Sequence, residues 1–157
     1  LANRAKTLVY AKDRTGEILW NIMAPTLRYS AELHGDIADD IVAIDNAMKW
    51  GFGWQQGPFE IWDAIGVAKS VEKMKEEGAE VPAFVQRLLD QNYETFYKEE
   101  DGELYFFDGD DYKPVPVNEK VIDLKRYKKK HGVIKKNTGA SLIELGDGIA
   151  LLNFHSQ

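Results

Sequence analysis

The sequence contains no cysteine. A disulfide-stapled secreted scaffold and a zinc site with cysteine ligands are therefore both excluded, and a reducing compartment is compatible with the composition. No stretch approaches the roughly 18 consecutive apolar residues of a membrane-spanning helix. The chain begins with Leu1 rather than methionine, and its first residues lack the layout of a signal peptide. From these absences we expect a cytoplasmic chain without a membrane span that starts inside a longer gene product.

The charge balance is acidic, with 26 Asp and Glu residues against 20 Lys and Arg residues and a formal net charge of −6. A negative protein is repelled by the phosphate backbone, so a general nucleic-acid binder is disfavoured. Apolar residues make up 44% of the 157 residues, which is ordinary for a globular protein. This length and composition suffice for one domain with a core, or for one domain plus a fragment.

Helical periodicity dominates the first ninety residues. Residues 16–33 place Leu19, Met23 and Leu27 near helical spacing, and Pro25 inside this pattern predicts a kink. A second helix is expected to start at Asp36 as its N-cap. Three more helices are predicted at 59–65, 68–77 and 82–91. The helix at 68–77 is highly charged, so we expect it to be largely exposed.

The pattern changes after residue 92. Residues 103–107 have strand composition and precede a turn-like segment at 108–110, and Pro114 and Pro116 favour an extended stretch. Residues 125–136 are strongly basic. Residues 140–155 form two short apolar runs around Gly146-Asp147-Gly148 and predict a β-hairpin. A domain boundary is therefore expected between about 110 and 140.

Several residue groups have both a functional and a structural interpretation. The glycines at 51, 53 and 57 suggest a phosphate cradle, but a dinucleotide fingerprint needs G-x-G-x-x-G after a strand. Here the spacing is one residue longer and the preceding element is a helix, which favours a tight inter-helix connection. None of the histidines has a metal-like or nucleophile-like partner by spacing, which favours surface or capping roles for His34, His131 and His155.

Charged and aromatic clusters also have to be weighed against ordinary surface and core positions. An aspartate group lacks the further ligands of a calcium loop and favours a solvated turn; its members are Asp108, Asp110 and Asp111. The basic residues at 125–136 fit either a solvated linker helix or a site for cofactor phosphates or an acidic partner. The indoles at 20, 50, 54 and 62 favour core or interface positions, and exposure of two or more of them would favour a docking surface.

Residues 46–66 contain an alanine-methionine helix end, a glycine-aromatic loop and Gly-Pro-Phe-Glu leading into a helix. This block closely resembles the C-terminal helical domain of 3-hydroxyacyl-CoA dehydrogenases. The proline-containing helix before it and the stretch at 40–45 agree in order and spacing, so the resemblance covers roughly residues 15–100. It implies a mainly α fold with a short β-containing C-terminal tail.

Residues 137–156 resemble the opening hairpin of an enoyl-CoA hydratase of the crotonase type. The two resemblances together imply a slice through the junction of a bifunctional enzyme. Residues 1–112 would be the helical domain, residues 113–136 a basic linker, and residues 137–157 the truncated start of the hydratase-like domain.

The resemblance also implies what this chain lacks. The family's nucleotide-binding domain carries the cofactor fingerprint and the catalytic His and Glu, and this chain does not include it. The helical domain of the family usually contributes an Asn five residues before the helix proline, a position that is Trp20 here, while Asn21 lies four before Pro25. We therefore expect no catalytic, cofactor-binding or metal-binding residues in this chain. Asn21 and Trp20 are the only, weak, candidates for substrate binding. The domain is expected to be a second, non-catalytic copy.

By this resemblance the parent protein is an NAD-dependent 3-hydroxyacyl-CoA dehydrogenase of fatty-acid β-oxidation, with a fused enoyl-CoA hydratase as a further expectation. The isolated piece is expected to bind no NAD and to be inactive, serving as a substrate-wall or interface domain. Its expected partners are the acyl-CoA substrate through the parent protein, the missing NAD-binding and hydratase domains, and a second copy in a homodimer. The alternative is a pure oligomerisation or domain-docking module without a role in catalysis.

Overall fold

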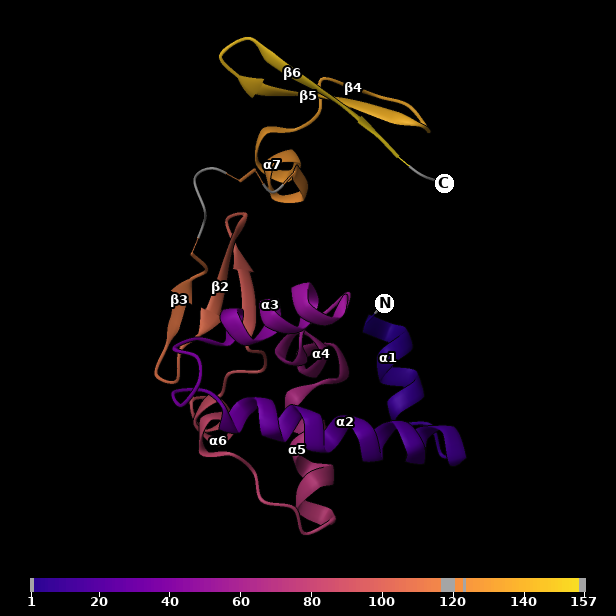
Figure 1. Cartoon of the computed structure of the whole chain (residues 1–157), viewed down its shortest axis with the longest axis vertical. Coiled ribbons are helices and arrows are strands. Elements are labelled where there is room, and N and C mark those ends of the chain that lie inside the picture. The colour runs from indigo at the N-terminus through magenta and orange to yellow at the C-terminus, as the bar shows by residue number, and fades with distance from the viewer. Residues whose placement is uncertain (1, 117–120, 123, 156–157) are drawn as a thin grey trace. The chain divides into compact units, whose positions relative to one another are not determined.

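The computed structural model describes residues 2–116, 121–122 and 124–155, which belong to two compact units (Figure 1). The first unit comprises Leu1–Lys98 and Leu104–Val115, and the second comprises Glu99–Glu103 and Pro116–Gln157. The described residues form seven helices and two three-stranded sheets, so the mainly α expectation with a β-containing C-terminal part agrees with the structure. No helix in these ranges combines the length and apolar character that a membrane crossing needs.

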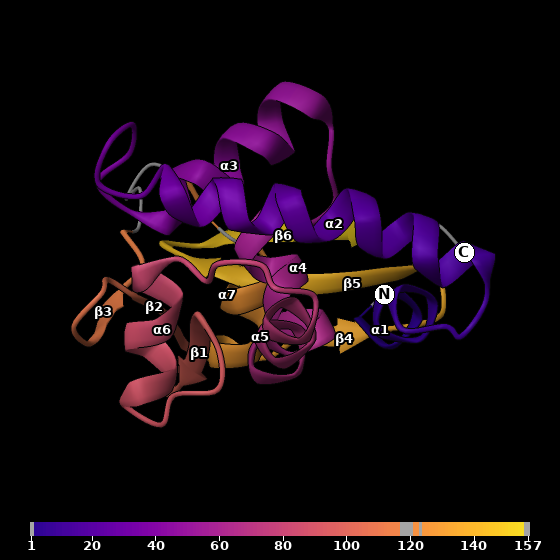
Figure 2. The ribbon, with the colours of Figure 1, turned by 90° about the horizontal axis from the view of Figure 1, so that it is seen from below.

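The helices of the first unit are α1 (Ala2–Val9), α2 (Arg14–Glu32), α3 (Ile41–Phe52), α4 (Pro58–Ile65), α5 (Val67–Glu76) and α6 (Ala83–Asp90). Helix α2 is the longest, and Figures 1 and 2 show it running past α4. Helix α1 folds back beside the start of α2, and α1, α2 and α4 contact one another.

Helix α2 confirms the helix predicted at 16–33. Asp13 is its N-cap, and the Asp13 Oδ1 atom accepts the Gly16 N–H at 3.0 Å, so the helix begins two residues before the predicted start. Pro25 lies inside the helix, and the kink expected there stays a prediction. The buried face repeats at helical spacing; it includes Trp20, Ala24, Leu27 and Ala31.

The prediction that Asp36 caps the next helix is wrong. Asp40 is the N-cap of α3, and its carboxylate accepts the Ala43 N–H at 2.7 Å. Asp36 lies instead in a turn that is closed by the Gly35 N–H donating to the Ala38 carbonyl at 2.9 Å. Helix α3 begins at Ile41, which is also the first fully buried residue of its apolar face, so the start of the helix coincides with the start of its packing against the core.

The glycine-rich segment connects α3 to α4, as the inter-helix interpretation predicts. Gly53 ends α3 in the left-handed region at φ 67°, a conformation that glycine adopts without a steric cost. Gly57 is the N-cap of α4 and lies against Asp45, where an added Cβ would come within 2.3 Å of the Asp45 Cβ and Cγ atoms. The loop therefore allows α4 to pack closely against α3.

Helices α4, α5 and α6 confirm the predictions at 59–65, 68–77 and 82–91 within two residues. The expectation that the charged helix α5 is largely exposed is wrong for one face, because Val67, Ser70, Val71 and Met74 are buried. Its charges occupy the opposite face, which is typical of an amphipathic helix.

Aromatic side chains fill the core of the first unit. Phe59 and Phe96 meet edge to face with ring centroids 5.0 Å apart, and Phe84 stacks on Phe96 at 5.9 Å. The Trp62 indole N–H donates to the Ser70 hydroxyl at 2.5 Å, so the polar atom of this buried ring is satisfied. These contacts join α4, α5, α6 and the segment that follows α6.

The first sheet has the strand order β1 (Tyr97–Glu100), β2 (Glu103–Phe107) and β3 (Tyr112–Pro114). β2 confirms the predicted strand and pairs with β3 in antiparallel fashion, with Phe106 opposite Lys113. The second sheet has the order β4 (Lys135–Lys136), β5 (Ala140–Gly146) and β6 (Ile149–Phe154). β5 and β6 form the predicted hairpin, and its turn residues Asp147 and Gly148 have φ angles of 51° and 75°.

Candidate functional site

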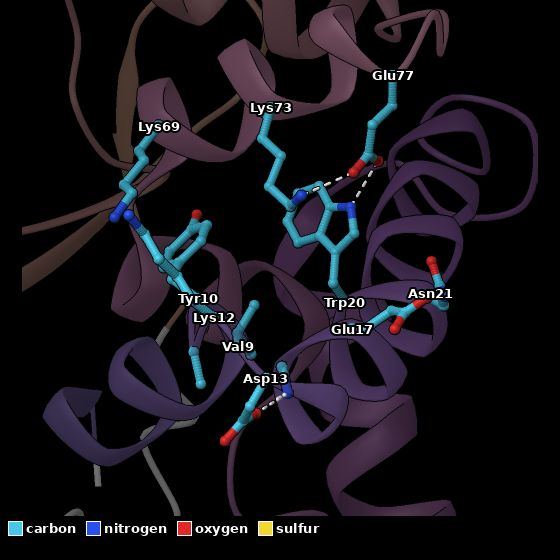
Figure 3. Close-up of a pocket in the computed structure, with 12 residues that line it drawn as sticks. Val9, Tyr10, Lys12, Asp13, Glu17, Trp20, Asn21, Lys69, Lys73 and Glu77 are labelled. Carbon is cyan, nitrogen blue, oxygen red and sulfur yellow. Dashed lines mark hydrogen bonds and ion pairs between the residues drawn. The ribbon is translucent and has the colours of Figure 1, made fainter.

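The corner between α1 and α2 forms one wall of a pocket of about 670 Å³ (Figure 3). α1 ends at Val9, and the chain turns through residues 10–13 before Asp13 caps α2. Gly16 makes this turn sterically feasible, because an added Cβ would lie 2.0 Å from the Ala11 carbonyl oxygen. Charged side chains of α5 and the residue after it form the opposite wall, and they are Lys69, Lys73 and Glu77.

Trp20 lies in the wall of this pocket and is only 3% exposed. Its indole N–H donates to Glu77 Oε2 at 2.6 Å, and Glu77 Oε1 pairs with the Lys73 ammonium at 2.7 Å. The Lys73 ammonium also lies 4.9 Å from the centroid of the Trp20 ring, within the range of a cation–π contact. The indole is thus fixed by both its polar atom and its ring face.

Tyr10 makes the second aromatic surface of the pocket. Its ring centroid lies 6.0 Å from that of Trp20, and the Lys69 ammonium lies 4.0 Å above the Tyr10 ring. Burial raises the pKa of the Tyr10 hydroxyl to about 12, so this group is protonated at neutral pH. Two lysines of α5 therefore lie over two aromatic rings of the α1–α2 corner.

The chemistry available in this pocket is binding rather than proton transfer. The hydrogen bonds from Lys73 and Trp20 lower the pKa of Glu77, which makes its carboxylate a weaker base. Asn21 lines the same pocket, but it is exposed and its side chain makes no hydrogen bond with another described residue. The structure thus places both weak candidates, Trp20 and Asn21, at one pocket, with Trp20 in its wall and Asn21 at its edge.

A pair of carboxylates that sequence reasoning missed, the buried Asp45 and the half-buried Asp63, joins α3, α4 and β1. Asp45 is fully buried and accepts the Phe59 N–H at 2.8 Å and the Glu60 N–H at 3.2 Å. It also accepts the Tyr97 hydroxyl at 2.9 Å. Burial raises the pKa of Asp45 to about 6, although its three donors oppose that shift.

Asp63, on α4, binds backbone in a similar way. Its two oxygens accept the Phe96 N–H at 2.7 Å and the Tyr97 N–H at 2.9 Å. Burial raises the pKa of Asp63 to about 7. Perturbed carboxylates often mark active sites, but every oxygen of this pair already accepts a hydrogen bond, so the pair anchors backbone. The signal available in the sequence was the Asp45 carboxylate at a core position of an apolar helix.

The three histidines have different surroundings. His34 is half-buried and stacks on Phe84 with centroids 4.1 Å apart, and burial lowers its pKa. His131 stacks on Tyr127, and His155 is exposed after β6. No histidine makes a hydrogen bond or ion pair with a carboxylate of the described residues. This arrangement differs from the acid–base pairing of a histidine catalyst.

The aspartates at 108–111 form a turn. Asp108 Oδ1 accepts the N–H groups of Asp110 and Asp111, both at 2.9 Å. The described part of the chain contains no cluster of side chains able to hold a metal ion.

The basic segment forms helix α7 (Leu124–His131) and the short strand β4. Lys129 pairs with Glu99 at 2.7 Å, and Lys130 lies 3.9 Å from Glu103. The side chains of Lys125 and Arg126 lie outside the described set. Two cations of the cluster are thus engaged with carboxylates, as in a solvated helix, and the anion-site alternative stays a prediction.

Comparison with known proteins gives the class of this fold. Residues 18–134 match the model of the 3-hydroxyacyl-CoA dehydrogenase C-terminal domain, which is more than half of the chain. The chain therefore belongs to the 3-hydroxyacyl-CoA dehydrogenase C-terminal domain family.

Two curated relatives are similar to this chain. A probable 3-hydroxyacyl-CoA dehydrogenase of Bacillus subtilis is 54% identical over 154 residues, which cover 98% of this chain and 20% of that protein. The mouse mitochondrial hydroxyacyl-coenzyme A dehydrogenase is 38% identical over 73 residues, which cover 43% of this chain and 23% of that protein. The chain thus spans about a fifth of the length of the bacterial relative. No solved structure matches it significantly.

Proposed function

We propose that this chain is the accessory helical part of an NAD-dependent 3-hydroxyacyl-CoA dehydrogenase that acts in fatty-acid β-oxidation. Its role is to form a wall of the substrate region or an interface, without an active site of its own. Family membership and the similarity to the bacterial dehydrogenase over 98% of the chain support the parent activity. Hydride transfer needs the nicotinamide and the substrate alcohol held together beside a base, and the parent protein's other domains would supply these.

Trp20 is the observation that carries the accessory role. In the family pattern an Asn stands five residues before the helix proline, and Trp20 occupies that position before Pro25. The indole is 3% exposed and fixed to Glu77, so it fills space instead of presenting a polar group. Asn21 lies about 100° further around the helix, so its amide does not replace the missing one.

The test is steady-state kinetics of the full gene product carrying Asn21→Ala. We expect kcat within a fewfold of wild type, because Asn21 positions no reacting group. Thr15→Ala is the matched control, since Thr15 is exposed in the first turn of the same helix and lies outside the pocket. Loss of a catalytic group would lower kcat about a hundredfold or more, and a drop of that size with an intact fold would refute the accessory role.

A direct test on the isolated chain is calorimetric titration with NAD, together with an absorbance assay for NADH formation from 3-hydroxyacyl-CoA. We expect neither binding nor turnover. Micromolar NAD affinity would overturn this component of the proposal.

We further propose that the β5–β6 hairpin is the beginning of a fused enoyl-CoA hydratase domain. The match to the bacterial relative includes both compact units, which supports a common arrangement of helical unit and hairpin within one longer chain. The test is to measure hydratase activity of the full gene product on an enoyl-CoA. A full gene product without hydratase activity would refute the proposal of a fused hydratase domain.

The second candidate is a docking module with no role in catalysis. Among the four indoles only Trp50 is exposed, while Trp54 is half-buried and the other two are buried, so the criterion of two or more exposed indoles is not met. The observation that favours docking is the pair of exposed aromatic side chains at the end of α3, where Trp50 is 81% and Phe52 is 75% exposed. Unchanged kcat and KM for every pocket variant would favour this candidate over the substrate-wall role.

A further inference from the structure

An apolar groove lies on the first unit, away from the Trp20 side of α2. It has a volume of about 410 Å³, and the residues lining it come from α1, α2, α4 and the loop before α4. None of these side chains is charged; they are Ala5, Leu8, Val9, Leu19, Met23, Trp54, Gln55, Gln56 and Ile61.

The groove continues onto an exposed stripe of α2. At about 100° per residue, Ile18, Ile22, Leu19 and Met23 fall within an arc of about 140° on this helix. Leu19 and Met23 line the groove, while Ile18 is 48% and Ile22 is 60% exposed. Leu8 on α1 borders the same groove and is 48% exposed. Large aliphatic side chains grouped in this way are typical of an interaction surface rather than of scattered surface residues.

The composition of the groove selects among classes of partner. A membrane-binding face carries lysines and arginines around its apolar centre, and no cation lines this groove. The polar groups at its edge are the neutral amides of Gln55 and Gln56, which suit hydrogen bonds to another protein surface.

The length of the bacterial relative indicates where that surface comes from. The match covers 98% of this chain but only 20% of the relative, so four-fifths of that protein lie outside the matched segment. A surface in the same polypeptide meets the groove at a high effective concentration, so a face of modest size suffices for stable docking.

We propose that the groove and the α2 stripe dock an apolar surface in the remaining portion of the same polypeptide. This inference rests on the proposed function only in that it places the chain within a longer enzyme. Docking here would cover Leu8, Ile18 and Ile22 and would fix the orientation of α2. The opposite side of α2, with Trp20 and Asn21, would then keep its pocket open to substrate or solvent.

The absence of cysteine makes thiol labelling a direct test. Ile22→Cys and Leu8→Cys are the probes, and Ile37→Cys is the control, because Ile37 is 74% exposed in the loop before α3 and lies outside the groove. In the isolated chain all three thiols should react with a maleimide at similar rates. In the full gene product the two probe sites should react at least about tenfold more slowly, while the control stays within about twofold; peptide mass spectrometry assigns the labelled site.

Two results would overturn the inference. One is equal labelling of the probe sites in the isolated chain and the full gene product. The other is that the probe thiols of the isolated chain react more slowly as the protein concentration rises, together with a dimer mass in sedimentation. The groove would then be occupied by a second copy of the chain. Dehydrogenase activity measured on the same full-length sample separates this inference from the proposed function. Protected probe sites without activity would refute only the function, and activity with unprotected sites would refute only the docking.

Discussion

Gly51 and Gly57, six residues apart near the α3–α4 connection, should respond to alanine with opposite signs. Gly57→Ala places a methyl group 2.3 Å from the Asp45 Cβ and Cγ atoms and 2.4 Å from its Cα. The backbone at Gly57 has φ −76° and ψ 172°, which alanine adopts readily, so the penalty is purely steric. Gly51 lies in the last turn of α3 with no atom near its added Cβ, and it serves as the matched control.

The magnitude of the Gly57→Ala effect follows from what Asp45 must do to make room. Overpacking costs about 1–3 kcal/mol by itself. If Asp45 moves, its charge-assisted hydrogen bonds to Phe59 and Glu60 at the start of α4 weaken, which adds about 1.5–3 kcal/mol. We therefore expect a loss of about 2.5–6 kcal/mol, whereas Gly51→Ala should stabilise by up to about 1 kcal/mol through helix propensity.

Urea denaturation followed by circular dichroism measures both free energies of unfolding. A loss of about 2.5–6 kcal/mol is a large fraction of the roughly 5–15 kcal/mol that holds a domain folded, so the midpoint of Gly57→Ala should fall clearly. The reasoning would be refuted if Gly57→Ala unfolded within about 0.5 kcal/mol of wild type, or if Gly51→Ala were the more damaging substitution.

Three further predictions concern the carboxyl groups of Asp45 and Asp63, the pocket and the hairpin. The folded-state pKa of Asp63, about 7, and that of Asp45, about 6, both lie above the ordinary value of 3.8, so the folded chain retains protons that the unfolded chain releases. Stability should therefore fall by about 3–4 kcal/mol as pH rises from 5 to 7, and Asp63→Asn should flatten this slope; a rising curve would contradict the assignment. Trp20→Phe removes the indole N–H bonded to Glu77 and leaves a smaller ring, so it should lower the free energy of unfolding by about 1–2 kcal/mol; an unchanged thermal midpoint would show that this contact contributes nothing. Residues 137–155 should show weak hydrogen-exchange protection in the isolated chain unless it dimerises, because the outer edge of β6 lacks a partner strand among the described residues; strong protection in a demonstrated monomer would contradict this.

Local signals in the sequence were sufficient for the long helices and the hairpin. Helix α2 combines a capping Asp13 with a regular apolar face, and the β5–β6 turn carries Asp147-Gly148, a pair suited to positive φ. Elements that depend on distant partners were missed. Helix α1 has only eight residues and a polar composition, and it is held by packing against α2 and α4. Strand β1 contains Lys98 and two glutamates, which are not typical of a strand.

The candidate site could be predicted only incompletely. The position of Trp20 relative to Pro25 is a count along the chain, so the sequence alone showed that an indole replaces the expected amide. Its pairing with Glu77 joins residues 57 apart, and the bond from Tyr97 to Asp45 joins residues 52 apart. No local pattern encodes contacts at such separations, because they arise only when the helices pack.

The two N–H groups held by Asp63 have a mechanical consequence. Phe96 and Tyr97 lie just before Lys98, where the chain first leaves the helical unit for the second one. A pulling force applied to residues 99–103, directly after this crossing, would load the Asp63 carboxylate through both bonds at once. The Phe96 side chain, next to these two hydrogen bonds, packs against Phe59 and Phe84. The load is therefore shared with the aromatic core and does not act on one residue at a time. The helical unit should therefore resist stretching at this point and yield in a single cooperative step once these two hydrogen bonds break.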